Sequence, residues 1–107
     1  MKLEWHDLTI PDSSPKVAVA QLRKEEGGAF WSLVRFPAGW ERPVAGHYVV
    51  DEEFWILEGE LVLNEIPYRQ GEGTRVAAEA ARTDTRSPLG ALVVARFGGA
   101  ATWVRES

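Results

Sequence analysis

Apolar and polar residues alternate along much of this chain in short runs. Residues 17–22 (VAVAQL) and 29–36 (AFWSLVRF) each repeat with the period of two that is typical of a β-strand. In the second run Trp31 and Arg35 share one face, because neighbouring strand side chains point to opposite sides. Residues 89–97 (LGALVVARF) are the longest apolar run and predict a buried strand.

Turn-forming residues separate these runs from several other short ones. Residues 1–15 are predicted to be a polar arm, and residues 67–73 a loop. A tight turn is expected at Gly59. The further strands are expected at residues 44–50, 53–57, 60–64, 74–77 and 101–105. Strands at a spacing of about ten residues, with no long helical pattern, predict an all-β sandwich or barrel.

The length of the chain, 107 residues, predicts a single domain over residues 1–107. We expect the arm of residues 1–15 to precede a β-barrel formed by residues 16–105. Hydrophobic residues make up 45% of the chain, which is enough for a packed core.

Composition excludes several classes of protein. The chain has no cysteine, so a disulfide framework or a thiolate metal site is impossible. Its net charge of −4 and its interspersed charges do not fit nucleic-acid binding, which needs a basic patch. No stretch is apolar over signal-peptide or membrane-span length, so we expect a cytoplasmic protein with no membrane partner.

Candidate chemistry is concentrated in residues 39–59, and the string DEEFWILEGEL (51–61) resembles the first motif of the cupin superfamily. Six residues separate Glu52 from Gly59, as in that motif. GGAFWSLVRFPAG and TRSPLGALVVARF are similar to the ChrR-like branch of these RmlC-like proteins. The resemblance implies a cupin jelly-roll barrel, also called a double-stranded β-helix, with the ligand site inside.

The resemblance also implies a metal site of three histidines and one glutamate, and most of it is missing. The first two histidines belong near positions 46 and 48, or 45 and 47, where only His47 is a histidine. Thr83 stands where the third belongs. Two ligands, His47 and Glu52, are too few for a tight site. We therefore expect no cofactor, with a weak or adventitious divalent metal left open.

Three residues are candidates for catalysis. His47 is a candidate general acid or base, the role in which histidine is most common, or else a structural loop histidine. Glu52 is expected to face the barrel interior, where burial raises a carboxyl pKa, or to pair with an arginine. Tyr48 would donate a hydrogen bond to a substrate, or would simply pack in a strand.

Substrate-binding candidates are aromatic and polar side chains of the expected barrel: Trp31, Arg35, Trp40, Phe54 and Thr83. Five tryptophans in a chain of this length suit the wall of a pocket for an organic ligand. The alternative is that tryptophans pack in the core, or that Trp55 and Trp103 form a dimer interface. Arg35 would grip a carboxylate or point to solvent.

These residues predict a cupin that binds a small molecule inside its barrel. Our first hypothesis is a metal-independent enzyme, an isomerase, cyclase or lyase in which His47 and Glu52 act on the substrate as a proton-transfer pair. The first alternative is a ligand-binding or sensor protein without turnover. The second is a metal-dependent cupin oxygenase with a reduced ligand set. A homodimer is expected because the terminal strands have no helix to cover their edges.

Overall fold

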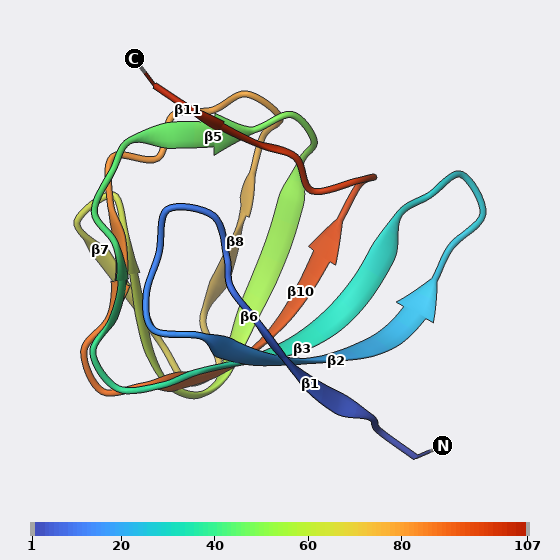
Figure 1. Cartoon of the computed structure of the whole chain (residues 1–107), viewed down its shortest axis with the longest axis horizontal. Coiled ribbons are helices and arrows are strands. Elements are labelled where there is room, and N and C mark those ends of the chain that lie inside the picture. Colours follow the sequence, from blue (N-terminus) through green and yellow to red (C-terminus); the bar gives the residue numbers. More distant parts are fainter. Residues whose placement is uncertain (1, 107) are drawn as a thin grey trace.

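Residues 2–106, the part of the chain that this computed structural model describes, form eleven β-strands and no α-helix (Figure 1). That range therefore contains no helix long and apolar enough to cross a membrane. The strands in chain order are β1 (Trp5–Leu8), β2 (Val17–Lys24), β3 (Phe30–Phe36), β4 (Trp40–Arg42), β5 (Gly46–Tyr48), β6 (Glu52–Leu63), β7 (Ile66–Arg69), β8 (Gly73–Val76), β9 (Thr85–Ser87), β10 (Ala91–Phe97) and β11 (Trp103–Arg105).

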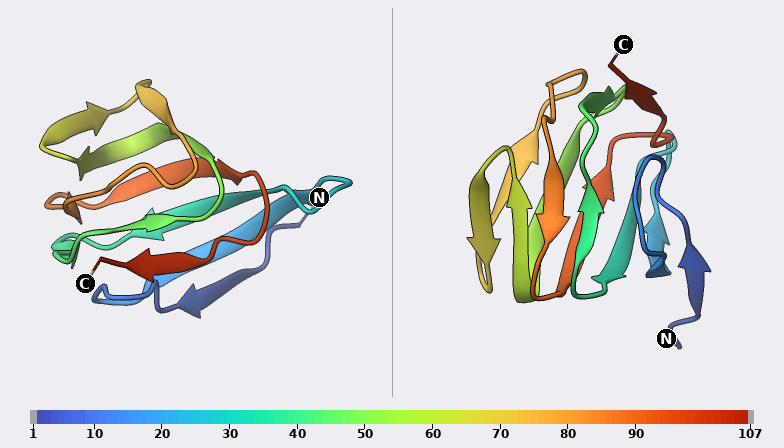
Figure 2. Two further views of the ribbon diagram at one scale, coloured as in Figure 1. Left: turned by 90° about the horizontal axis from the view of Figure 1, so that it is seen from above. Right: turned by 60° about the vertical axis from the view of Figure 1, so that its left-hand side comes forward.

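Nine of the strands form one strongly curled antiparallel sheet. Its order is β1-β2-β3-β10-β6-β9-β4, and β7 and β8 also pair with β6. The remaining strands, β5 and β11, pair with each other and lie across one end of the curl (Figures 1 and 2). The curled arrangement confirms the all-β jelly-roll barrel expected from the sequence, with a hollow interior bounded by strands.

Strand β6 links the two halves of this barrel. Its first part pairs with β8 and β10, and its second part pairs with β7 and β9. Gly59 lies between these parts with a φ of 77°, and a Cβ built there would lie 2.0 Å from the carbonyl oxygen of Gly90. The predicted turn at Gly59 is therefore a bend within one continuous strand, where only glycine fits.

Two segments that the sequence predicted as an arm and a loop contain strands in the structure. β1 lies in the arm and pairs with β2, and β7 occupies part of the loop at residues 67–73. β9, which follows Asp84, is a strand that the sequence analysis did not predict. Every residue of β1 is exposed, so no apolar pattern marks it. Backbone hydrogen bonds with neighbouring strands define such short strands, rather than a pattern of their own side chains.

Side chains alternate between the core and the outer face in the first half of β6 and in β10, whereas β2 departs from the predicted alternation by burying both Val17 and Ala20. In β6 the side chains of Glu52, Phe54 and Ile56 are buried, while Trp55 and Leu57 are exposed. In β10 the alternate residues Ala91, Val93 and Ala95 are buried in the same way. These inward faces, together with Phe36 and Trp40, build one hydrophobic core. The core forms the wall of the barrel interior.

Candidate functional site

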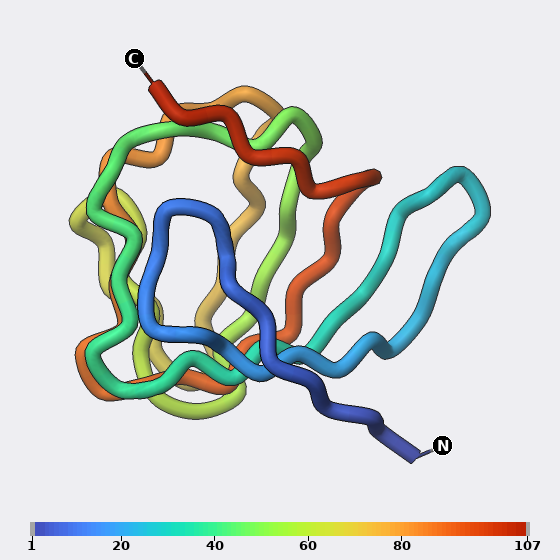
Figure 3. The backbone as a smooth tube through the Cα atoms, in the orientation of Figure 1, coloured from blue at the N-terminus to red at the C-terminus, as the bar shows by residue number. Residues whose placement is uncertain are grey.

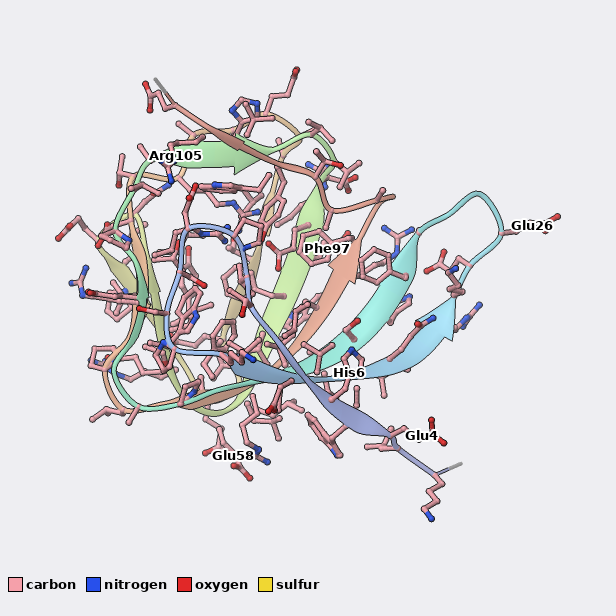
Figure 4. The ribbon with its side chains drawn as sticks, viewed as in Figure 1. Glu4, His6, Glu26, Glu58, Phe97 and Arg105 are labelled. Carbon is pink, nitrogen blue, oxygen red and sulfur yellow. The ribbon has the colours of Figure 1, made fainter. Side chains whose placement is uncertain are left out.

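A cavity of about 120 Å³ lies inside the curled sheet. Aromatic and aliphatic side chains form most of its wall: Val34, Phe36, Trp40, Phe54, Leu61, Leu63, Val93, Ala95 and Phe97. Figure 4 shows side chains filling the space within the sheet, with Phe97 among them. Ile10, Pro11 and Ala101 line the cavity from two loops, and Ala101 is exposed, so it marks the mouth.

A larger depression of about 440 Å³ lies on the outer surface near Arg35, Glu58 and Leu89. It is open, and Figure 4 shows Glu58 at the outer edge of the molecule. Arg35 and Glu58 lie 3.8 Å apart there, with more than half of each side chain exposed. Such exposed ion pairs contribute little energy. The smaller internal cavity, which encloses buried charged groups, is therefore the better candidate site.

Four buried polar side chains converge on the internal cavity: Arg42 from β4, Tyr48 from β5, Glu52 from β6 and Arg82 from the β8–β9 connection. Each is less than 10% exposed. Strand alternation places the first three, because Arg42 shares its face with Trp40 and Glu52 shares its face with Phe54. Two backbone hydrogen bonds with Gly46, of 2.8 and 3.1 Å, hold Arg82 in place.

Glu52 and Arg82 form a buried ion pair. Nη1 of Arg82 lies 2.7 Å from Oε1 of Glu52. Burial raises the pKa of the Glu52 carboxyl above its ordinary value, while the positive charges of Arg82 and Arg42 act in the opposite direction. The environment of Glu52 therefore favours a carboxyl group that can take up or release a proton.

Arg42 has a different environment, made of aromatic rings. Both of its Nη atoms donate to the hydroxyl oxygen of Tyr48, at 3.2 and 3.1 Å. Its guanidinium carbon lies 3.7 Å from the centre of the Trp103 ring and 5.2 Å from that of Tyr48. Arg42 is thus a buried cation held by π-systems and a hydroxyl group.

Three buried polar atoms of this cluster have no hydrogen-bond partner among residues 2–106: Nε of Arg42, Nε of Arg82 and Oε1 of Glu52. Oε1 nevertheless lies at ion-pair distance from Arg82, so the two Nε donors are the atoms left without any partner in this part of the chain. Unpaired buried polar atoms are costly, so they call for an explanation such as bound water or a ligand. All three belong to residues that line the cavity.

The N-terminal and C-terminal parts of the chain meet beside the cavity. The loop between β1 and β2 folds back towards β11, as the backbone trace in Figure 3 shows. Asp12 in this loop accepts hydrogen bonds from Nε1 of Trp103, at 2.9 Å, and from Arg105. These hydrogen bonds lower the pKa of Asp12 to about 2, and the bond from Arg105 has the largest effect. The contact fixes Trp103 over Arg42.

The residues of the cavity do not fit the metal that the cupin resemblance implies. Residues 2–106 contain no group of three or more histidine or acidic side chains placed to hold a metal ion. Glu52 is the one carboxylate lining the cavity, and a guanidinium group lies against it. Two cationic side chains would repel a metal cation, so we derive no chemical step through a metal.

Several residues predicted for the site do line the cavity. Tyr48 and Glu52, two of the candidate catalytic residues, both lie in its wall, as do Trp40 and Phe54 from the candidate substrate-binding set. Alternation along β6 places Glu52 and Phe54 on the same inward face. Glu52 also pairs with an arginine, Arg82, which was the alternative considered for it, and both residues line the cavity.

The other predicted site residues lie elsewhere. His47 faces away from Tyr48 on β5, in a shallow outer depression with Glu79, so the expected proton-transfer pair of His47 and Glu52 is not formed. Trp31 stacks on Trp55, with ring centres 6.4 Å apart, on the outer face of the sheet. Arg35 is exposed, and the hydroxyl group of Thr83 bonds to Asn64 at 3.1 Å. Each lies on a face opposite to the cavity or outside it.

Arg42 and Arg82 were not among the site residues predicted from the sequence. Arg42 follows Trp40 by two residues, so the inward position of Trp40 was the available signal for it. Arg82 directly precedes Thr83, the position aligned with a cupin histidine. A shift of one residue in that alignment would have pointed to Arg82.

No family model and no curated protein matches this sequence. Solved structures do match. A Methylibium petroleiphilum protein proposed to be an acetylacetone dioxygenase is 18% identical with a TM-score of 0.80, over 95% of this chain and 75% of that one.

Two further structures support the same architecture. An RmlC-like cupin protein of Ralstonia eutropha is 15% identical with a TM-score of 0.75, over 98% of this chain and 68% of that one. A chain from the complex of SigE with the anti-sigma factor ChrR of Rhodobacter sphaeroides is 18% identical with a TM-score of 0.69, over 89% of this chain and 49% of that one. This chain therefore has the cupin, or RmlC-like, fold.

Proposed function

We propose that this protein binds a small organic molecule in the internal cavity. The observation that carries the proposal is the convergence of four buried polar side chains on a space with mostly apolar walls. Ligand sites typically combine an apolar wall with a few placed polar groups. The name of the Methylibium protein, an acetylacetone dioxygenase, also points to a small organic molecule for that protein.

Blocking the mouth tests this proposal. Ala101 is exposed and lines the cavity, so Ala101→Phe is expected to place a ring in the mouth without disturbing the core. Ala100 is also exposed but does not line the cavity, so Ala100→Phe is the matched control. We expect small molecules that bind the wild type, found by ligand-observed NMR screening, to bind Ala100→Phe equally well and Ala101→Phe at least about tenfold more weakly.

Equal binding to both variants would place the ligand outside the cavity and contradict the proposal. A screen of neutral and charged small molecules that finds no ligand for the folded wild type would do the same.

A second candidate function is metal-independent proton transfer on the bound molecule, as in an isomerase, cyclase or lyase. The environment of Glu52 favours it, because burial raises the pKa of this carboxyl and it is the one carboxyl group in the cavity wall. Tyr48 would then hydrogen-bond the substrate. His47 has no part in this version, because it faces away from the cavity.

The variant Glu52→Gln separates catalysis from binding. If Glu52 transfers the proton, its replacement is expected to lower kcat by about 10²–10⁴-fold on a substrate found in the screen. Glu53→Gln, on the opposite face of β6, is the matched control and is expected to leave kcat unchanged. Full retention of kcat in Glu52→Gln would exclude this role, and recovery of every ligand unchanged would favour the non-catalytic binding or sensor function.

The other sequence-based hypotheses carry less support. A metal-dependent oxygenase needs metal donors that the described part of the chain does not bring together. The homodimer and the cytoplasmic location stay predictions. The exposed side chains of Trp55 and Leu57 on the outer face of β6 are compatible with an interface there, whereas Trp103 is directed to Arg42.

A further inference from the structure

The cavity carries an uncompensated positive charge. Two guanidinium groups and one carboxylate line it, and the carboxylate of Glu52 is paired with Arg82. The charge of Arg42 also acts on Asp12, but Asp12 already binds Arg105. With Glu52 paired to Arg82 and Asp12 paired to Arg105, one positive charge, that of Arg42, has no counter-ion among the described residues. A buried charge without a counter-ion is unfavourable, so the protein alone leaves this site electrostatically incomplete.

The free hydrogen-bonding groups beside Arg42 are mainly donors. The hydroxyl oxygen of Tyr48 accepts from both Nη atoms of Arg42, so its own hydrogen is free to point elsewhere. Nε of Arg42 and Nε of Arg82 are donors without a partner. Two or three donors and a positive charge match an ionised carboxylate, which accepts hydrogen bonds and donates none.

The size and walls of the cavity limit what accompanies that carboxylate. An engineered protein cavity of about 150 Å³ holds benzene, so about 120 Å³ suits a molecule of about five non-hydrogen atoms. Side chains such as Phe36, Phe54 and Val93 make the remaining wall apolar. A short hydrocarbon tail gains from burial there, whereas inorganic phosphate would lose hydration against the same wall.

We infer that the cavity takes a small monocarboxylate, with its carboxylate group against Arg42 and Tyr48 and its short tail among the apolar side chains. This inference rests on the proposed function, because it names the chemical class of the ligand for the same cavity. Trp103 covers one face of the Arg42 guanidinium, and Asp12 fixes Trp103, so the cation is presented to the ligand in a set orientation.

A comparison of propionate with propionamide tests the inference, because the two have nearly the same shape and differ in charge. The readout is the set of five tryptophan indole N–H signals in two-dimensional NMR at pH 7 and constant ionic strength. We expect propionate to shift the signals of Trp40 and Trp103, which lie at the cavity and over Arg42. The outer Trp31 and Trp55 signals are expected to stay in place.

Charge-assisted hydrogen bonds predict that propionate binds about 10- to 100-fold more tightly than propionamide. Arg42→Met keeps an apolar side chain of similar length under Trp103 and is expected to remove this difference. Arg35→Met, at an exposed arginine whose side chain does not line the cavity, is the matched control and is expected to preserve it. Glu52→Gln makes the cavity more positive and leaves Arg42 in place. Because it removes the negative charge, it is expected to tighten propionate binding by about tenfold or more.

The failures of the two proposals are distinguishable. Equal affinity for propionate and propionamide, or binding of the amide alone, overturns the carboxylate inference and leaves the binding cavity standing. Tighter binding of inorganic phosphate than of propionate also overturns it. Absence of any shift at Trp40 and Trp103 with every probe argues against the carboxylate inference and against the binding cavity together. Weaker propionate binding in Glu52→Gln contradicts the electrostatic argument even if Arg42→Met does not fold.

Discussion

Replacing Arg82 with methionine is expected to destabilise the protein by about 3–5 kcal/mol, the usual cost of removing one partner of a buried ion pair. The side chains of Arg82 and Glu52 are 6% and 10% exposed, and 2.7 Å separates Nη1 from Oε1. Without the guanidinium group, the Glu52 carboxylate is a buried charge that has lost its ion-pair partner, and the folded state becomes less stable. Urea unfolding at pH 7, followed by tryptophan fluorescence, measures the change in the free energy of unfolding.

The double variant Glu52→Gln/Arg82→Met removes both charges and is expected to regain most of that loss. Arg86→Met is the matched control, because the Arg86 side chain is 40% exposed and pairs with Asp84 near the surface. Its expected cost is about 1 kcal/mol or less. A loss of similar size in Arg86→Met, or no recovery in the double variant, would show that the buried pair does not have the energetic role assigned to it.

Phe54→Ala is expected to destabilise the protein by about 3–5 kcal/mol, as large-to-small substitutions of buried aromatic residues do. Phe54 is 1% exposed, and its ring packs edge-on against Tyr68 with centres 5.3 Å apart. Its removal enlarges the existing cavity, because Phe54 already forms part of the wall. Thermal and urea unfolding of the purified variant provide the measurement.

The neighbouring substitution Trp55→Ala is the control for strand alternation. Trp55 is 38% exposed and stacks on Trp31 on the outer face, so the expected loss is about 1 kcal/mol. The larger side chain is therefore expected to matter less than the smaller one. Equal losses in the two variants would contradict the inward and outward assignment along β6.

The period of two made this alternation predictable without a structure. Buried positions alternate with less buried ones in the first half of β6 and in β10, because one face of each strand packs on the core and the other faces outward. The short strands β1, β7 and β9 lack that signal. They are defined by backbone pairing: β1 with the next strand β2, β7 with the end of β6 across a two-residue turn, and β9 with the more distant β4 and β6.

The candidate site was predictable to a smaller extent. Glu52, Tyr48, Trp40 and Phe54 lie at the cavity as expected, because short-range alternation determines which way each one points. His47 was placed at the pocket through the cupin resemblance, yet it lies next to the inward Tyr48 and must point the other way. The cupin resemblance places the His47 side chain in the pocket, whereas strand alternation directs it outward.

The residues of the chain determine its strands, its apolar core and the incomplete metal motif around Glu52, because each of these depends on neighbours in the sequence. The charge of the cavity depends on distances through space. Arg42 and Arg82 are 40 residues apart, with Glu52 and Tyr48 between them, and only barrel closure brings all four side chains to one cavity. Tertiary structure therefore decided that guanidinium groups, and not a set of histidines, surround the glutamate that the motif contributes.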